Sequence, residues 1–274
     1  MQRGLVFLDL GKPADGFAEN VVGLIIVDRG DLADQHIAAL APEGVPVAGA
    51  QRHAFAGGKA QFFASLEECR LNPKVRVVVV TGAGKGFCPG ADMDALNQIR
   101  ANPAGGAGPA TGAGRFSDFI SYPKPIIAAM NGAAAGVGFV LALFCDLRFA
   151  ASGIKLTTSF SRRGLIAEYG SSWALPKLIG MPRALDLLLS GRVITADEAE
   201  RMGLVNQVVP AEELMSHVMA YASDLAANCC PTSWAHMKKQ VYGDWEIDAD
   251  TATTNSIHMM NASVMRPDFQ EGVQ

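Results

Sequence analysis

The chain has 274 residues, of which 49% are apolar and 18% charged, so it is long enough for one large domain or for a core domain with a smaller appendage. This balance can fill a large hydrophobic core and excludes an intrinsically disordered chain. The formal net charge is −4 and no cluster of Lys and Arg stands out, so neither nucleic acid nor an anionic membrane surface is an expected partner.

The cysteines predict reduced thiols in a cytoplasmic protein. No CxxC pair occurs and no His lies at metal-ligand spacing from a Cys, so we expect neither disulfides nor a metal site. The segment 1–10 has one basic residue and a short apolar run, which is not typical of a signal peptide. The longest early apolar segment, Val21–Val27, is far too short to span a bilayer. The five cysteines are Cys69, Cys88, Cys145, Cys229 and Cys230.

The first third of the chain has a mixed pattern. Leu5–Leu10 and Val21–Val27 are apolar runs closed by turn residues, and we predict a strand for each. The segment 31–58 mixes Ala, Gly, Pro and charges without a firm period and receives no prediction. Lys59–Arg70 has the spacing of an amphipathic helix. Val75–Thr81, a nearly unbroken β-branched run, predicts a strand buried on both faces.

Two strand-to-helix units follow, each joined by a glycine-rich turn. The first turn, Gly82–Gly90, leads into a short predicted helix, Asp92–Ile99. The segment 101–115 is rich in Gly, Ala and Pro and predicts a mobile surface loop. Pro125–Met130 is expected to be a buried strand. Gly136–Leu143 is apolar all round and predicts a buried helix.

The second half of the chain is mostly helical. Apolar patterns still predict strands at Leu147–Ala151, Lys155–Ser159 and Leu204–Val209. Thr195 is the predicted N-cap of one helix, with Glu198 at the capping-box position. Strands that alternate with helices and then give way to a helical tail indicate an α/β superhelix with a C-terminal helical region. The predicted helices are Ser172–Ile179, Arg183–Ser190, Ala196–Met202 and segments near 211–228, 232–242 and 247–264.

The turn Gly82–Gly90 fits neither of two nucleotide-binding motifs. A Walker A loop needs Gly-Lys followed by Ser or Thr, but here Lys85 precedes Gly86 and no hydroxyl follows. A Rossmann fingerprint fails because Phe87 or Pro89 takes the place of the last Gly.

A second glycine-rich entry to a helix lies at residues 131–139. Helix N-termini present unpaired N–H groups and a partial positive charge. Two such ends that converge on one point would form an oxyanion hole. Ordinary turns between strand and helix, without a ligand, fit the spacing at least as well.

Five segments, in order, resemble the signatures of the crotonase (enoyl-CoA hydratase/isomerase) family. VRVVVVTGAGKGFCPGADMDAL contains the family's Gly-Ala-Asp, and PKPIIAAMNGAAAGVGFVLALFCDLRFA runs from a Pro-Lys-Pro strand to a Cys-Asp after the buried helix. The resemblance implies a crotonase-like ββα superhelix core at 1–205 and a C-terminal helical trimerisation region at 206–274. The five segments are 75–96, 123–150, 160–180, 184–210 and 266–273.

The resemblance also implies an enzyme that acts on an acyl-CoA thioester in fatty acid metabolism and assembles as a homo-trimer or hexamer. Coenzyme A enters as part of the substrate, and no bound cofactor or metal is expected. The family signature near the CoA phosphates is not found cleanly in the first 70 residues. Arg29, Arg52 and Lys59 are candidates for this contact.

The site residues are carried over from the family's motifs. The N–H groups of Ala91 and Val137 would hold the thioester oxygen, with Val137 in place of the more usual Gly. A backbone donor tolerates this exchange where φ and ψ are ordinary. The implied substrate-binding residues are Gly90, Asp92, Met93, Gly136, Val140, Phe160 and Trp173.

The acid–base residues decide the reaction. Hydratases of the family use two glutamates, whose places are taken here by Val140 and Phe160, and neither side chain can transfer a proton. Glu168 resembles the carboxylate of the Δ3,Δ2-enoyl-CoA isomerases, and an apolar pocket around it would raise its pKa. We therefore favour a double-bond shift through a dienolate, with Glu168 as the proton shuttle. A hydratase with non-standard residues, a CoA-binding homologue with little catalysis, a dehalogenase and an unrelated α/β protein are the alternatives.

Overall fold

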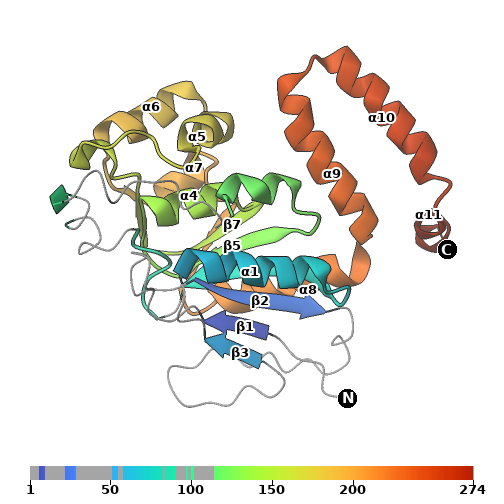
Figure 1. The fold of residues 1–274 in the computed structure, drawn as a ribbon, viewed down its shortest axis with the longest axis horizontal. Helices are drawn as coiled ribbons and strands as arrows, with labels where there is room; N and C mark the ends of the chain where they lie inside the picture. The colour runs from blue at the N-terminus through green and yellow to red at the C-terminus, as the bar shows by residue number, and fades with distance from the viewer. Residues whose placement is uncertain are drawn as a thin grey trace.

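The computed structural model describes residues 6–9, 22–28, 51–54, 58–82, 84–90, 97, 100, 101 and 114–273 (Figure 1). Some predictions lie outside these residues. They are the oxyanion donor Ala91, the substrate-binding residues Asp92 and Met93, the helix Asp92–Ile99 apart from Asn97, and most of the loop 101–115.

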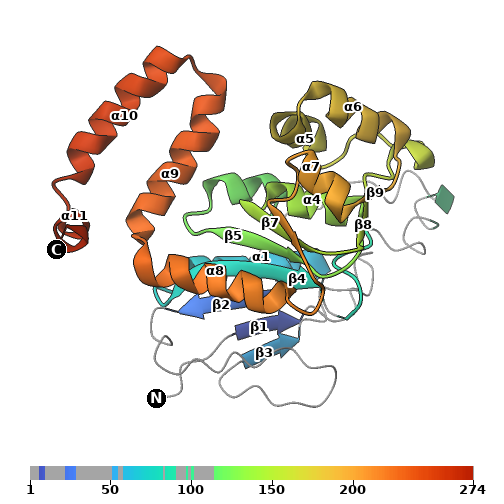
Figure 2. The same ribbon diagram turned by 180° about the vertical axis from the view of Figure 1, so that it is seen from behind.

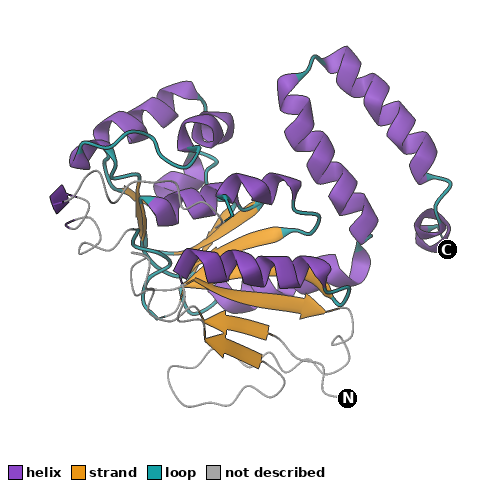
Figure 3. Cartoon of the chain, in the orientation of Figure 1, coloured by secondary structure: helices purple, strands orange, loops and turns teal. Residues whose placement is uncertain are grey.

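A seven-stranded sheet forms the centre of the molecule (Figure 3). In chain order its strands are β1 (Val6–Asp9), β2 (Val22–Asp28), β3 (Gln51–Ala54), β4 (Val75–Gly82), β5 (Ile126–Met130), β7 (Leu147–Ala151) and β10 (Gln207–Val209). The spatial order is β10-β7-β5-β4-β2-β1-β3. The first four of these run parallel, and β2 lies antiparallel between β4 and β1. Parallel strands bury both faces, which accounts for the mostly apolar sequence of β4 and the entirely apolar sequence of β5.

Two helices cover opposite faces of this sheet. Helix α1 (Gly58–Leu71) lies in front of it in Figure 1, and α8 (Leu214–Asn228) lies in front of it when the molecule is turned around in Figure 2. The buried apolar residues in the described part of α1 are Phe62, Leu66 and Cys69, which share one helix face at the predicted spacing. Helix α8 contacts β2, β4, β5 and β7.

A small second sheet holds the turn that opens the central helix. It consists of β6 (Ala134–Ala135), β8 (Lys155–Thr157) and β9 (Ile194–Thr195), in the order β6-β8-β9. Helix α4 (Val137–Phe144) begins two residues after β6, and all eight of its residues are buried. The prediction of a buried helix that is apolar all round is confirmed.

Three further helices follow: α5 (Ser171–Ile179), which contacts α4; α6 (Met181–Ser190), which contacts α5; and α7 (Ala196–Arg201), which contacts β9 and β10. The Thr195 hydroxyl accepts a hydrogen bond from the Glu198 N–H at 3.2 Å, so the predicted N-cap of α7 is confirmed. The Glu198 carboxylate pairs with Arg192 at 2.6 Å.

Three short segments differ from the sequence prediction. Gln51–Ala54, which received no prediction, forms β3 by parallel pairing with β1. The predicted strand Leu204–Val209 starts only at β10, because the N–H groups of its first two residues both donate to the Ala199 carbonyl (2.8 and 3.3 Å) and turn the chain there. A 3-10 helix, η1 (Phe116–Ser121), also had no counterpart in the prediction.

The last helices extend away from the sheet as an arm: α9 (Pro231–Gly243), the 3-10 turn η3 (Asp244–Glu246), α10 (Ala249–Ser263) and α11 (Pro267–Gly272) (Figures 1 and 2). Helices α10 and α11 bury none of their residues. The predicted boundary at residues 205/206 stays a prediction. Strand β10, which follows it, belongs to the central sheet, and α8 covers one face of that sheet. The separate helical part begins at α9.

Asp146 ties this arm to the sheet. Its Oδ2 atom accepts hydrogen bonds from the Ile126 N–H (2.8 Å) and from Lys238 Nζ in α9 (2.6 Å). The Tyr242 hydroxyl donates to the other carboxylate oxygen at 3.2 Å. Among the residues described, no helix is both long and apolar enough to cross a membrane.

Candidate active site

The two glycine-rich turns lie against each other. The N–H groups of Phe87 and Cys88 donate to the Ala133 carbonyl at 3.2 and 3.1 Å, and the Ala135 N–H donates to the Cys88 carbonyl at 3.0 Å. Segments more than 40 residues apart in sequence are thereby joined as a short parallel bridge. The convergence that the spacing could only suggest is confirmed for this part of the two turns.

Asn131, at the start of the second turn, also forms hydrogen bonds with the first turn. Its Oδ1 atom accepts from the Gly82 N–H at 2.9 Å, and its Nδ2 donates to the carbonyls of Gly82 (3.0 Å) and Gly84 (2.9 Å). A side-chain amide can serve donors and acceptors at once, which suits a position between two backbone segments. This role of Asn131 could not be predicted from the sequence, because an Asn-Gly pair is an ordinary turn signal.

Close backbone approach explains two of the glycines. Gly90 has a φ of 102°, and a Cβ atom there would lie 2.8 Å from the Ala135 carbonyl oxygen. A Cβ atom on Gly138 would lie 2.1 Å from the Cys88 carbonyl oxygen, which no side chain can accommodate without movement. The predicted site residues Gly90 and Gly136 are therefore neighbours, since the Cβ position of Gly90 lies 3.9 Å from the Gly136 Cα.

Val137 is the first residue of α4, so its N–H has no partner within the helix. The neighbouring Gly136 N–H is bonded to the Thr157 carbonyl at 3.1 Å, and Gly136 O accepts from Val140 N–H at 3.0 Å. The Val137 N–H itself has no hydrogen-bond acceptor within the described part of the chain. A donor of this kind, at the positive end of the α4 dipole, can stabilise a negatively charged oxygen. Its predicted companion Ala91 follows directly on Gly90.

Val140 and Phe160 are both buried, at 0% and 4% exposure. Val140 lies in α4, and the Phe160 ring comes within 3.9 Å of the Cβ position of Gly136. Phe160 therefore packs beside the turn that presents the Val137 N–H. It makes one side of this turn apolar and supplies no group that can transfer a proton.

Glu168 lies in the loop that enters α5 and is half-buried. Burial raises the pKa of its carboxyl above the ordinary value. Its carbonyl accepts from the N–H and the hydroxyl of Ser171 at 3.0 and 2.8 Å, which fixes the backbone of the loop. A Cβ on Gly170 would lie 3.1 Å from the Phe144 ring, so this loop packs against α4, the helix that carries Val137.

Tyr169, next to Glu168, has a left-handed backbone with φ of 53°. Such a conformation costs a non-glycine residue on the order of 1 kcal/mol and persists only where other contacts hold it. The Tyr169 ring lies 6.0 Å from that of Phe116, and the Lys59 ammonium lies 5.6–5.8 Å from the rings of Tyr169, Phe116 and Phe63. Lys59, a candidate for the CoA phosphates, thus lies over an aromatic cluster beside Glu168.

Trp173 contacts a different part of the molecule. Its ring lies 5.1 Å from the Trp245 ring, and the Lys177 ammonium lies 5.0 Å from it. Lys177 in turn pairs with Glu246 at 2.9 Å. The contacts of Trp173 join α5 to η3, so its assignment to substrate binding stays a prediction.

The cysteines are unpaired thiols. Burial raises the pKa of Cys88 to about 11 and that of Cys145 to about 12, so neither supplies a thiolate near neutral pH. Within the described ranges, no group of three or more His, Cys, Asp or Glu side chains could hold a metal ion.

The fold and the paired turns define an α/β protein in which a glycine-rich turn opens a buried helix, and comparison with known proteins gives its family. The family model Enoyl-CoA hydratase/isomerase matches residues 56–274. The 1,2-epoxyphenylacetyl-CoA isomerase of Escherichia coli K12 is 34% identical over 220 residues, covering 78% of this chain and 82% of that protein. The probable enoyl-CoA hydratase of Rhodobacter capsulatus is 32% identical and covers 75% and 79%.

A solved structure leads to the same family. The probable enoyl-CoA hydratase/isomerase from Mycobacterium abscessus has a TM-score of 0.71 at 30% identity, covering 78% of this chain and 82% of that one. The chain therefore belongs to the enoyl-CoA hydratase/isomerase (crotonase) family and is an enzyme of acyl-CoA thioesters. The expected crotonase fold with a helical C-terminal region is confirmed.

Proposed function

We propose that this protein moves a double bond of an enoyl-CoA from the Δ3 to the Δ2 position, with Glu168 as the proton shuttle. One observation carries the proposal. The two positions at which hydratases of the family carry glutamates hold the buried, apolar Val140 and Phe160, whereas Glu168 is a half-buried carboxylate of raised pKa. One carboxylate is sufficient for this isomerisation, but hydration by the usual route needs two.

The reaction divides into two proton transfers. The Glu168 carboxylate takes a proton from C2 of the 3-enoyl thioester, and the electron pair moves into a dienolate whose negative charge rests on the thioester oxygen. The N–H groups of Val137 and Ala91 stabilise this oxygen. The protonated Glu168 then returns the proton at C4, which leaves the double bond between C2 and C3. A raised pKa makes Glu168 an effective base and acid near neutral pH.

The experiment compares 3-enoyl-CoA with 2-enoyl-CoA substrates of several chain lengths. We expect 2-enoyl-CoA from the former and little 3-hydroxyacyl-CoA from the latter. Glu168→Gln should abolish isomerisation while acyl-CoA binding persists. The matched control is Glu68→Gln, on the exposed side of α1, which should retain full activity. Rapid formation of 3-hydroxyacyl-CoA by the wild type would favour a hydratase with non-standard acid–base residues, and binding without turnover would favour a CoA-binding homologue.

A second candidate reaction comes from the comparison. The E. coli relative is named as an isomerase of 1,2-epoxyphenylacetyl-CoA, which is also a CoA thioester. The same substrate panel should therefore include this epoxide. Conversion of the epoxide in preference to every 3-enoyl-CoA would move the assignment to that reaction.

We also propose that the protein is cytoplasmic and that the arm formed by α9–α11 joins copies into a trimer or hexamer. Helices α10 and α11 expose large apolar side chains although none of their residues is buried. An exposed apolar surface of this kind is typical of an interface. Light scattering after size exclusion should give three or six subunits, and a monomer would contradict the proposal. The exposed side chains are Ile257, Met260, Val264, Met265 and Phe269.

A further inference from the structure

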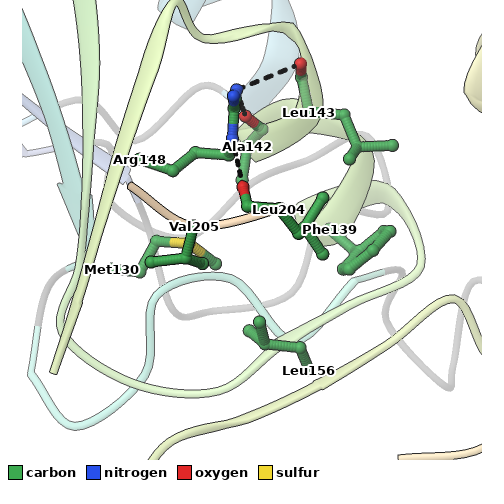
Figure 4. A pocket seen from close by; sticks show the side chains of 8 residues that line it. All are labelled: Met130, Phe139, Ala142, Leu143, Arg148, Leu156, Leu204 and Val205. Atoms are coloured by element: carbon green, nitrogen blue, oxygen red, sulfur yellow. Dashed lines mark hydrogen bonds between the residues drawn. The ribbon is translucent and has the colours of Figure 1, made fainter. Parts of the chain in front are cut away.

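Arg148, in β7, is a buried cation at the C-terminal end of α4. It is 6% exposed. Its Nε donates to the Leu204 carbonyl at 2.7 Å, and its Nη1 donates to the carbonyls of Cys145 (2.6 Å), Ala142 (3.3 Å) and Leu143 (3.4 Å). The last three carbonyls belong to the final turn of α4 and its C-cap, and Figure 4 shows the guanidinium turned toward that helix end. Arg148 thus satisfies carbonyls that a helix end leaves unpaired.

The charge of Arg148 has no dedicated counter-ion. Within the described part of the chain, no ion pair joins Arg148 to a carboxylate. Asp146, two residues before it, is bonded to Lys238 at 2.6 Å, and that pair is neutral as a whole. Burial lowers the pKa of Arg148, but a guanidinium remains protonated in proteins. The carbonyls at the C-terminal end of α4 carry only a partial negative charge, about half a unit, so they offset this cation in part.

The surroundings keep this charge effective over a distance. Helix α4 contains no ionisable residue, and the small cavity beside Arg148 is lined by apolar side chains, including Met130, Phe139 and Leu156 (Figure 4). Seven steps of 1.5 Å separate the first residue of α4 from its last, a distance of about 10 Å. At an effective dielectric constant of about 20, a unit charge at that distance shifts an ionisation equilibrium on the order of tenfold.

We propose that Arg148 is a positioning residue of the oxyanion site, which holds the end of α4 in place and adds its own charge to the positive potential at the Val137 N–H. This inference rests on the oxyanion site of the proposed function. Negative charge that develops on the thioester oxygen is then stabilised by the helix start and by a cation at the far end of the same helix. The ground-state thioester carries no such charge and gains much less.

The test measures the enolate directly. A 3-oxoacyl-CoA ionises to an enolate that absorbs in the near ultraviolet, so titration of the bound ligand gives its pKa on the protein. Arg148→Met should raise this pKa by about one unit, a tenfold loss of enolate stabilisation. The same variant should lower kcat for isomerisation with little change in KM. Arg148→Lys, which keeps the charge, should lose less than threefold.

A second variant leaves Arg148 and α4 untouched. Asn206 is exposed to solvent, and its Oδ1 atom accepts a hydrogen bond from the Arg148 backbone N–H at 2.8 Å. Asn206→Asp keeps this acceptor and places a negative charge beside Arg148. This variant should also raise the pKa of the bound ligand. The ionisation constant should change only about twofold, because solvent screens the added charge. Asn255→Asp, on the exposed arm, is the charge-matched control and should leave the pKa unchanged.

The outcomes separate the two proposals. If the wild type does not lower the pKa of the bound ligand, the oxyanion site itself is refuted. If it does, and folded Arg148→Met leaves that pKa unchanged, Arg148 has only a structural role. Where Arg148→Met shows no cooperative thermal transition, Asn206→Asp decides, and an unchanged pKa in that variant overturns the inference.

Discussion

A buried ion pair is one of the contacts that attach the C-terminal arm to the sheet, and it makes Lys238→Met a sharp perturbation. The Lys238 and Asp146 side chains are 11% and 15% exposed, and their charged atoms lie 2.6 Å apart. Lys238 Nζ also donates to the carbonyls of Phe119 (3.1 Å) and Lys124 (3.2 Å). Removing the ammonium leaves a buried carboxylate without its counter-charge and two carbonyls without this donor.

The cost follows from what remains around the carboxylate. Losing one partner of a buried ion pair costs about 3–5 kcal/mol, because the other charge stays desolvated. Asp146 would keep the Ile126 N–H and the Tyr242 hydroxyl as donors, so we expect the lower end, about 3 kcal/mol. This is a large share of a typical stability of about 5–15 kcal/mol.

Denaturant unfolding at a fixed protein concentration should measure this loss, with tryptophan fluorescence reporting on Trp234 in α9. The double variant Lys238→Met with Asp146→Asn removes both charges and should recover part of the loss. A loss below about 1 kcal/mol for Lys238→Met would refute the reasoning, since a pair that matters so little cannot be desolvated. The reasoning also fails if the double variant is less stable than the single one.

The remaining predictions concern the site. Gly138→Ala puts a Cβ 2.1 Å from a backbone oxygen and should cost about 3 kcal/mol in denaturant unfolding, whereas Gly243→Ala, with open space around it, should be close to neutral. Asn131→Ala unpairs backbone groups of both turns and should cost about 1–3 kcal/mol and lower kcat; equal kcat for Asn131→Ala and wild type would show that the turns hold without it. In the proposed mechanism Glu168 acts as a carboxylate base, so kcat/KM should rise with pH through a midpoint above the ordinary Glu value of about 4.3. An acid limb at or below that value would contradict the raised pKa.

Local signals in the sequence determined much of the fold. The β-branched run of β4 and the all-apolar α4 could be predicted because a segment buried on every side needs no polar positions. The cap at Thr195 could be predicted because its partner lies three residues away in the same chain segment. The ordered motifs also gave the family, and with it the positions Glu168 and Val137.

Contacts between segments that lie far apart in the chain could not be predicted from the sequence. Strand β3 exists because β1 offers it an edge, and its own residues carry no strand pattern. The placement of Lys59 over aromatic rings and of Trp173 against Trp245 depends on segments that meet only after folding. The place of β10 in the central sheet could not be predicted for the same reason, since a short strand belongs to whichever sheet it pairs with.

The sequence by itself thus determined which segments are strands and buried helices and which residue types stand at the positions of the family's chemistry. Only the tertiary structure decided what surrounds them: the aromatic cluster beside Glu168, the hydrogen bonds of Asn131 between the two turns, and the buried Arg148 at the C-terminal end of α4. The physical reason is the separation along the chain over which each effect acts. Periodicity and caps act within a few residues, whereas burial, electrostatic potential and pKa depend on groups that the chain brings together from far apart.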